Sequence, residues 1–424
     1  MTSAQEGPVP SHGLTRRRLM VAGGLGLAAG AGAVAARDVG APHDRAGSTG
    51  VVVPYYGPHQ AGIATATQNC LHFAALDLTT KRREDVAELL RRWTDAAARM
   101  CGGEAAATVD DNPLAPPVDT GEAHELGPAR LTVTFGFGVG MFTSGGQDRY
   151  GLAARRPAAL ADLPPFRGDH LEPGRSDGDL AIQACADDPQ VAFHAVRNLI
   201  RIARGTAVLR WSQLGFSRTA TNSQAQATPR NLMGFKDGTN NIRAEDAAAM
   251  SEHVWVGDEG PLWMRGGSYV VTRRIRMHIE HWDRSSLGDQ EATIGRIKSS
   301  GAAFGRTRES DPVDLGAKDA GGALLVPLDA HVRLAAPISN DGVRILRRGY
   351  SFTDGVDPVT GGLDAGLFFI GFQRDPRKQF VPIQQRLAAD DALNEYIRPT
   401  SSAVFACPAG TVEGRAVGAG LFEG

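Results

Sequence analysis

Four short segments of the sequence carry side chains whose chemistry goes beyond packing. The segment GFKDGTNN contains Asp237, a carboxylate that can exchange a proton. The segment DAHVRLAAP contains His331, an imidazole that can bind a metal ion or a proton. The segment RILRRGYSF contains Arg347, whose guanidinium can stabilise an anion. The fourth segment, GLFFIGFQ, begins at Gly366 and has the composition of a buried strand. The set therefore offers a metal ligand, an acid–base group, a cation and an apolar wall.

Each segment has a plainer explanation when it is considered alone. Glycine, aspartate and asparagine in a row specify tight turns, so GFKDGTNN reads as a surface turn. A single histidine is more often packed or solvated than bound to a metal. A pair of arginines usually lies at a solvated edge, and an apolar strand usually belongs to the core. The functional interpretation therefore depends on all four segments occurring in this order.

In this order the segments resemble the dye-decolourising peroxidases, above all the secreted subgroup that includes the deferrochelatase peroxidases. The resemblance runs from about Tyr56 to Pro408 and also includes YGPHQAGI, GDL, QACADDP and HAVRNL. It implies a haem peroxidase that reduces H2O2 through a ferryl intermediate. Bulky organic donors such as dyes and phenolics would then be oxidised in one-electron steps.

The resemblance also implies roles for the polar residues. One haem b per chain would take His331 as the axial ligand of its iron. Asp237 would move a proton between the two peroxide oxygens, and Arg347 would stabilise the negative charge that develops as the O–O bond breaks. Arg347 is preferred to Arg348 because it is the first arginine of RRGY, as in the family. The sequence departs from the family at Ala336, where relatives often have asparagine.

A proximal histidine normally donates its second N–H to a carboxylate. Asp391 is the candidate for this role, although a helix N-cap is an equal explanation and Asp390 is adjacent. Leu367 and Phe369 are expected to wall the distal pocket and to limit access to molecules about the size of H2O2. Bulky donors would then react at the haem edge or at a surface tyrosine or tryptophan.

The haem propionates need donors of their own. Arg333 follows the ligand by two residues, on the same face if the segment is a strand, and its fork of donors suits a propionate. The turn formed by Lys236, Gly238 and Thr239 is a second candidate. Two other histidines occur in motifs shared with the family, His59 and His194, and both are expected to be structural.

Three other classes of function compete with the peroxidase. The first is a haem-binding protein that releases iron, in the manner of a deferrochelatase. The second is a redox partner that consumes peroxide made by a secreted oxidase. The third is a protein of the same fold that binds no haem.

The elements that would position these residues form two similar halves. In each half an apolar strand leads through DPxxxF into a helix, at Asp188 and again at Asp375. The matched context indicates an internal duplication. We therefore predict an α+β fold of two ferredoxin-like domains, each with an antiparallel sheet and peripheral helices, with haem in the C-terminal half. The expected strands are 70–78, 131–142, 179–186, 206–211, 268–280, 366–373 and 403–407, and the expected helices are 81–100, 189–204, 289–298 and 376–388.

The N-terminus reads as an export signal. Three arginines, at 16–18, precede an uncharged run rich in alanine and glycine, and Ala33-Val34-Ala35 provides a cleavage site. The pattern resembles a twin-arginine signal, which implies a bacterial protein exported in the folded state, with the export machinery as a partner and no stable membrane insertion afterwards. An uncleaved anchor is the alternative. The predicted divisions are the signal 1–35, a linker 36–58, the halves 59–225 and 226–412, and a tail 413–424.

Composition narrows the remaining classes of protein. The 424 residues carry a net charge of −2, and no basic block follows the first twenty residues, so no nucleic-acid partner is expected. No nucleotide-binding fingerprint is present, which disfavours a dehydrogenase or an NTPase. The four cysteines form no CxxC pair, so buried thiols or at most two disulfides are expected rather than a zinc site. The sequence does not indicate an oligomeric state.

Overall fold

The computed structural model describes residues 50–108 and 112–423. The predicted export signal and most of the predicted linker lie outside these residues. All described residues belong to one compact unit. Among them, no helix is both long enough and apolar enough to cross a bilayer.

The N-terminal half contains four long strands and two helices that alternate as strand, helix, strand, strand, helix, strand. Their bounds are β1 (Cys70–Leu78), α1 (Arg83–Cys101), β2 (Thr132–Gly138), β5 (Leu180–Ala186), α2 (Pro189–Ile202) and β6 (Ala207–Arg218). A small hairpin, β3 (Thr143–Ser144) and β4 (Gln147–Asp148), follows β2. The long strands pair antiparallel in the order β6–β1–β5–β2, which is the ferredoxin-like order.

The C-terminal half repeats this plan. Its elements are α3 (Ala247–His253), β7 (Ser268–Met277), α4 (Ile279–Trp282), α5 (Leu287–Ile294), α6 (His331–Leu334), β8 (Leu346–Arg347), β9 (Tyr350–Val356), β10 (Leu363–Gln373), α7 (Phe380–Asp390) and β11 (Ile397–Cys407). The four long strands pair in the order β11–β7–β10–β9, so each strand has a counterpart in the first half. This is the duplicated ferredoxin-like α+β fold that the sequence predicts.

The two sheets join into a closed ring of eight strands. β2 pairs with β11 where Gly138 lies opposite Phe405, and β6 pairs with β9 where Phe216 lies opposite Ser351. Both junctions are short and antiparallel, and each joins the second strand of one half to the fourth strand of the other. The ring was not predicted, because the pairs that close it are few and link residues far apart in the chain.

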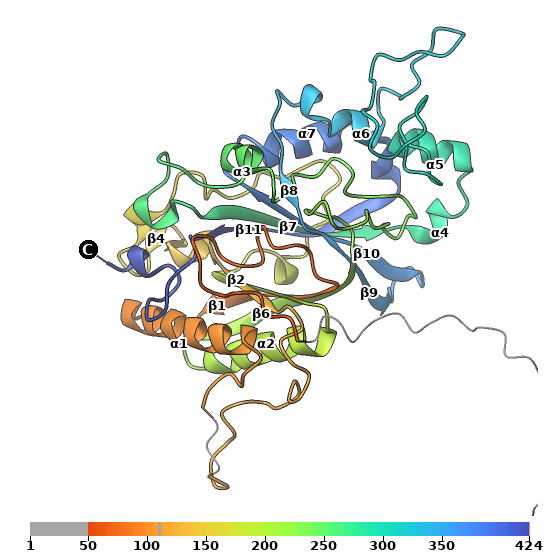
Figure 1. Cartoon of the computed structure of the whole chain (residues 1–424). Coiled ribbons are helices and arrows are strands. Elements are labelled where there is room, and N and C mark those ends of the chain that lie inside the picture. Colours follow the sequence, from red (N-terminus) through yellow and green to blue (C-terminus); the bar gives the residue numbers. More distant parts are fainter. Residues whose placement is uncertain (1–49, 109–111, 424) are drawn as a thin grey trace, which may run out of the picture. The chain divides into compact units, whose positions relative to one another are not determined.

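Alternation along the strands divides the core between the inside and the outside of the ring. On β1, Leu71, Phe73 and Ala75 pack into one cluster with residues from β5, β6, β7, β9, β10 and β11, and this cluster fills the ring. Leu76 on the same strand points outward and packs under α1 and α2. These two helices lie side by side on the outer face of the N-terminal sheet, whereas α5, α6 and α7 lie over the C-terminal half (Figure 1).

Several element boundaries differ from the sequence-based expectation. β9 was missed as a strand because its second half runs into the glycine- and aspartate-rich hairpin before β10, which reads as loop. β6 and β11 extend beyond the predicted ranges, and β11 does so through Pro399. α7 begins at Phe380, one turn later than its DPxxxF counterpart, because Asp375 starts a turn there, whereas Asp188 caps α2 directly. α5 ends at Ile294, where Gly295 takes a left-handed conformation.

The four cysteines are free thiols. Cys101, Cys185 and Cys407 are buried, and burial raises the pKa of the Cys101 thiol to about 12. They pack as small apolar side chains, in agreement with the plainer of the two expectations.

Stability at acid pH is expected to depend on His72 of β1. Its side chain is only 6% exposed, and burial lowers its pKa from 6.5 to about 4. The unfolded chain therefore binds a proton that the folded chain refuses, and the free energy of unfolding falls between pH 6.5 and pH 4 by up to about 3 kcal/mol. Urea unfolding at pH 7 and pH 4.5 measures this loss. The variant His72→Phe should show a smaller loss, and an equal loss in both proteins would exclude His72 as its source.

Candidate active site

Arg347 reaches the outer face of the C-terminal sheet from the short strand β8. This strand pairs with β10 so that Arg347 lies opposite Gly371, and Leu346 points into the ring. Arg348 is fully buried and turned away, and its guanidinium donates to the Thr65 carbonyl and to Gln68 Oε1. The side chain of Arg347 instead forms an ion pair with Asp237. Of the two adjacent arginines, Arg347 is therefore the one whose side chain reaches Asp237.

Asp237 lies on a turn that has no place in the sheet. Its backbone N–H donates to the Pro229 carbonyl at 3.1 Å, and Gly234 has a φ of +84°, which few other residues adopt. A Cβ on Gly238 would lie 3.0 Å from the Thr221 nitrogen, so the turn can approach that backbone only with glycine there. Asp237 Oδ1 faces Arg347 Nη1, and the described part of the chain gives Oδ2 no partner.

The residues on either side of Asp237 bind a carboxylate that the sequence did not suggest. Lys236 Nζ pairs with Glu309 Oε2, and Thr239 Oγ1 donates to Glu309 Oε1 at 3.1 Å. These donors were expected to meet a haem propionate, and that role stays a prediction. Glu309 lies 70 residues beyond Thr239 in a segment that reads as loop, so no local signal identifies it.

Asn241 is a second residue that sequence reasoning missed. Its Oδ1 accepts from the backbone N–H of Arg347 at 2.8 Å, and its Nδ2 donates to the Arg347 carbonyl at 2.8 Å. Nδ2 also donates to the Thr221 carbonyl at 3.0 Å. Asn241 thus fixes the backbone of Arg347 while Asp237, on the same turn, binds its side chain. An asparagine in a glycine-rich turn is normally explained by turn geometry, which concealed this contact.

Removing the Asn241 amide is expected to impair the site through Arg347. Asn241→Ala should lower the rate of any Arg347-dependent step by about tenfold, because the guanidinium loses its fixed origin. The check is a double-mutant cycle with Arg347→Ala, in which the rate of that step is measured for each single variant and for the double variant. If Asn241 acts through Arg347, then Asn241→Ala should lower the rate only slightly when Arg347→Ala is already present. Equal costs in both backgrounds would assign Asn241 a general structural role.

His331 is the first residue of α6, a one-turn helix rather than the extended segment considered from the sequence. Its Nδ1 lies 2.6 Å from Asp391 Oδ2. The other oxygen of Asp391 accepts from the Leu393 N–H at 2.9 Å and so caps the short 3₁₀ helix that follows. The two explanations considered for Asp391 are therefore compatible, since each uses one carboxylate oxygen. With Nδ1 engaged, Nε2 is the nitrogen of His331 that can bind a metal.

The helix changes the expectation for Arg333. Residues two apart in a helix do not share a face, so Arg333 does not point with His331. Its Nε donates to the Pro327 carbonyl at 2.9 Å, and its Nη2 donates to the carbonyls of Leu315 at 2.6 Å and Val326 at 2.7 Å. The guanidinium holds the preceding loop, and pairing with a propionate stays a prediction for its remaining nitrogen.

The charges of Asp237 and Arg347 both act on His331. Burial lowers the pKa of His331, but the charge and hydrogen bond of Asp391 outweigh it, and the net pKa is raised. Asp237 raises this pKa further and Arg347 lowers it. The side chain of His331 is 38% exposed, whereas that of Asp391 is 2% exposed. Burial among the surrounding protein atoms is nevertheless the largest single influence on the pKa of His331. The side chain of His331 is thus partly exposed, with the buried Asp391 carboxylate against one ring nitrogen and the charges of Asp237 and Arg347 within electrostatic reach.

Apolar side chains complete the surroundings. Leu367 and Phe369 alternate along β10 on its outer face, and both are half-buried. Leu367 packs against the cluster of Met233, Phe235 and Trp282, and the ring of Phe369 lies 5.9 Å from that of Phe380.

The other two histidines of interest have different partners. His59 Nδ1 lies 2.6 Å from the Gly266 carbonyl and its ring stacks on Trp255, and His194 Nε2 lies 2.9 Å from Asp119. They are part of packed contacts, as expected from the sequence.

The donor set limits what can bind at His331. Within the described residues, no group of three or more His, Cys, Asp or Glu side chains could hold a metal ion. A metal bound through His331 would fit this setting if its other ligands came with it, as those of iron in a macrocycle do. The acid–base and cationic groups of Asp237 and Arg347 would then serve a small molecule bound to the open face of that metal.

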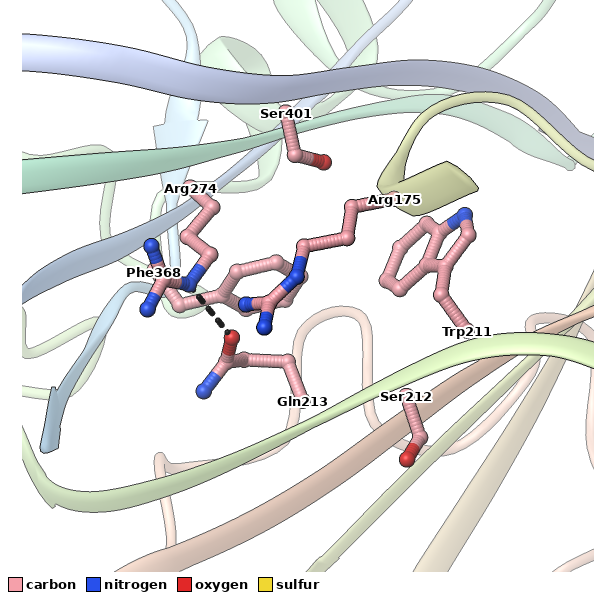
Figure 2. Close-up of a pocket in the computed structure, with 7 residues that line it drawn as sticks. All are labelled: Arg175, Trp211, Ser212, Gln213, Arg274, Phe368 and Ser401. Carbon is pink, nitrogen blue, oxygen red and sulfur yellow. Dashed lines mark hydrogen bonds between the residues drawn. The ribbon is translucent and has the colours of Figure 1, made fainter. Parts of the chain in front are cut away.

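A separate hollow opens through the wall of the ring, where β6 and β9 diverge. It has a volume of about 490 Å³ and is lined by Arg175, Arg210, Trp211 and Asp354 among others. A smaller space of about 10 Å³, room for one water, continues inward to Arg274, Phe368 and Ser401 (Figure 2). Its lining residues include none of those assigned above to the site around His331.

Both halves of the chain match family models. Residues 60–217 match the model described as Dyp-type peroxidase, N-terminal, and residues 228–412 match Dyp-type peroxidase, C-terminal. The dye-decolorizing peroxidase of Thermobifida fusca is 41% identical over 377 residues, which cover 86% of this chain and 84% of that protein. The deferrochelatase of Escherichia coli (strain K12) is 36% identical over 358 residues, which cover 83% of this chain and 82% of that protein.

Solved structures give the same result. The DyP-type peroxidase of Streptomyces coelicolor superposes with a TM-score of 0.81 at 43% identity and covers 89% of this chain and 98% of its own. Ferric DtpA of Streptomyces lividans has the same TM-score, identity and coverage.

Proposed function

Because the chain belongs to the Dyp-type peroxidase family, we propose that His331 faces Asp237 and Arg347 across a haem, at which this enzyme reduces hydrogen peroxide. Family membership makes the chain a peroxidase with haem as its cofactor. The roles of individual residues are our assignment.

The residues present fit haem. His331 offers one nitrogen with its other nitrogen held by a buried carboxylate, and no further protein ligand is grouped around it among the described residues. An aliphatic and an aromatic side chain, Leu367 and Phe369, lie on the neighbouring sheet face. When bound, haem would supply the redox chemistry of the reaction.

On the distal side, Asp237 would move the proton. Its unpartnered Oδ2 takes a proton from one peroxide oxygen and returns it to the other, which leaves as water. Arg347 Nη1, already beside Asp237 Oδ1, presents its charge to the oxygen on which negative charge develops. Asn241 keeps the Arg347 backbone in place during this exchange.

On the proximal side, Asp391 would set the character of the ligand. Its 2.6 Å contact with His331 Nδ1 fixes the tautomer and orientation of the ring and gives the imidazole partial anionic character. That character favours the oxidised states of a bound iron.

The observation that carries the proposal is the contact of His331 Nδ1 with the buried Asp391, which leaves Nε2 of a half-exposed imidazole available, together with the ion pair of Asp237 and Arg347. The test is the visible absorption spectrum of the purified chain, before and after stoichiometric H2O2. A Soret band that changes with one equivalent of peroxide and returns after a donor is added supports the proposal. A chain that takes up no haem would contradict it.

Bulky donors need a separate place to react if the distal pocket admits only peroxide. We propose the hollow at Trp211, whose volume of about 490 Å³ suits a planar aromatic molecule. The ring of Trp211 lies 6.3 Å from that of Phe368, which sits on β10 between Leu367 and Phe369. An electron taken from a donor at Trp211 then has an aromatic route toward the haem side of the sheet. Asp354, in the same hollow, can accept the proton that a phenol loses.

Trp211→Phe is expected to lower kcat/KM for a bulky dye by about tenfold or more while leaving the reaction with H2O2 unchanged. Tryptophan is easier to oxidise than phenylalanine, and the substitution keeps an aromatic ring in the core. The matched control is Trp263→Phe, at a partly buried tryptophan that also packs on aromatic rings. Stopped-flow rates for peroxide and steady-state rates for the dye are compared. An equal loss of kcat/KM for the dye in Trp211→Phe and Trp263→Phe would contradict a special role for Trp211.

Release of iron is the second candidate function, because relatives of similar identity carry the name deferrochelatase. Mass spectrometry of the haem product decides between the two. Intact protoporphyrin without iron would favour release, whereas unchanged haem after many turnovers would favour the peroxidase.

We also propose that the chain is exported by the twin-arginine route, on the strength of the arginines at 16–18 and the alanine-rich run after them. Replacing Arg16 and Arg17 by lysine in the producing cell is expected to retain the protein inside. Unchanged export would contradict the assignment.

A further inference from the structure

One continuous segment links the turn that carries Asp237 to the helix that begins with His331. Residues 304–330 follow α5 and lead directly into α6. They contain no helix and no long strand, and they form a long excursion beside α5 and α6 (Figure 1). The segment is rich in glycine and aspartate, and most of its internal bonds are those of tight turns.

The segment is attached to the distal turn by Glu309. The carboxylate pairs with Lys236 through one oxygen and accepts from Thr239 Oγ1 at 3.1 Å through the other. These two partners flank Asp237 in sequence, so a single side chain spans the turn. The backbone carbonyl of Glu309 also accepts from Arg296 Nη1 at 3.3 Å.

Glu309 is well suited to hold such a contact. Burial raises the pKa of its carboxyl, but the bonds from Lys236, Thr228 and Thr239 outweigh burial, and the net pKa is lowered. The carboxylate is therefore charged when it meets the ammonium of Lys236. Both side chains are largely shielded from solvent, which strengthens the pair relative to an exposed one.

The segment is attached to the proximal helix by Arg333. Its guanidinium donates hydrogen bonds to three backbone carbonyls, those of Leu315, Val326 and Pro327. These carbonyls belong to both arms of the excursion, so Arg333 gathers the arms beside α6. The same segment is thus bonded to both elements between which haem is expected to lie.

We propose that residues 304–330 form a clasp across the edge of the haem, and that Glu309 is its latch on the distal turn. The inference rests on the proposed haem site between Asp237 and His331. Lifting the clasp from the distal turn or from the proximal helix would open a way out for a cofactor held there. Glu309 is the side chain of the clasp that reaches the distal turn, so its contacts govern how often the clasp opens.

The clasp and the propionate interpretation of Lys236 predict opposite effects of removing Glu309. If Lys236 and Thr239 serve a haem propionate, the loss of Glu309 frees both donors for it, and haem should be held more firmly. If Glu309 is a latch, its loss opens the clasp and haem should escape faster. The sign of one measured change therefore separates the two.

The experiment measures haem loss from the full, haem-loaded chain to an excess of apomyoglobin, which traps free haem. Glu309→Gln is expected to accelerate the loss by about 10- to 100-fold, the effect of losing charge-assisted hydrogen bonds. The matched control is Asp314→Asn, an exposed carboxylate on the same segment that bonds only within its own turn. The control is expected to lose haem at the wild-type rate.

A second variant guards against a Glu309→Gln protein that folds poorly. Lys236→Gln removes the partner instead, and the double variant should lose haem no faster than the faster single variant if the two residues form one latch. Haem loss from Glu309→Gln at or below the wild-type rate overturns the clasp. The Soret band of the wild-type protein is recorded separately, so a failed clasp is distinguishable from a failed haem site.

Discussion

Replacing His331 by alanine is expected to abolish ligation of the haem iron and to lower peroxidase turnover by at least about 10³-fold. The Nδ1 of His331 is held by the buried carboxylate of Asp391, and the charges of Asp237 and Arg347 act on its ring. The measurement is the Soret band of the purified variant after reconstitution with haem, together with turnover of a dye. An unchanged Soret band would remove His331 as the ligand.

Chemical rescue distinguishes a missing ligand from a damaged fold. The alanine variant leaves a space beside Asp391, whose carboxylate can hold the N–H of added imidazole. Imidazole is therefore expected to restore part of the spectrum and of the turnover. The rescue should fail when Asp391→Ala is added, because the free imidazole loses the group that orients it. Rescue that is independent of Asp391 would argue against the proximal role of that carboxylate.

Asp237→Asn is expected to slow the reaction with H2O2 by about 10²- to 10⁴-fold while haem binding stays unchanged. The amide has nearly the shape of the carboxylate, but it cannot take a proton from peroxide. Stopped-flow absorption under a single turnover measures the step directly. Asp341→Asn, an exposed aspartate close to Arg347 in sequence, is the control and is expected to react at the wild-type rate.

The result depends on how Asp237 and Arg347 share the work. If Asp237 only orients Arg347, then Asp237→Asn and Arg347→Ala should have similar effects that do not add. If Asp237 moves the proton, its loss should slow the reaction further in the Arg347→Ala background. A rate for Asp237→Asn equal to that of the wild-type protein would refute both roles.

The sequence predicted the fold better than it predicted the contacts of the site. Strand-like composition indicated β1, alternation indicated β2 and an apolar run indicated β10, and the repeated DPxxxF pointed to the duplication. β9 escaped because its residues after Phe352 are exposed and turn-like, and its place in the sheet depends on pairing with β10 and β6. Strands defined by their partners are hard to recognise from local composition.

Within the site, the resemblance supplied residue types, and the structure added the residues that hold them. Asp391 was considered as a partner of His331, and the contact between them spans 60 positions of the chain. Asn241 and Glu309 were not considered. Asn241 acts on the main chain of Arg347, 106 residues away, and Glu309 acts from a loop without periodicity. Nothing in the residue types of such partners distinguishes them from ordinary turn residues.

The way the ring closes gives the two halves the relation of two subunits in a symmetric dimer. In each junction the second strand of one half meets the fourth strand of the other, so the two halves are related by an approximate two-fold axis. A chain of half this length would leave both of those strands as open edges, and two identical copies would seal each other's edges as a symmetric dimer. The N-terminal copy buries its outer sheet face under α1 and α2, and the C-terminal copy carries His331, Asp237 and Arg347. The protein thus has the architecture of a homodimer joined into one chain, in which the N-terminal half supports the half that carries these three residues.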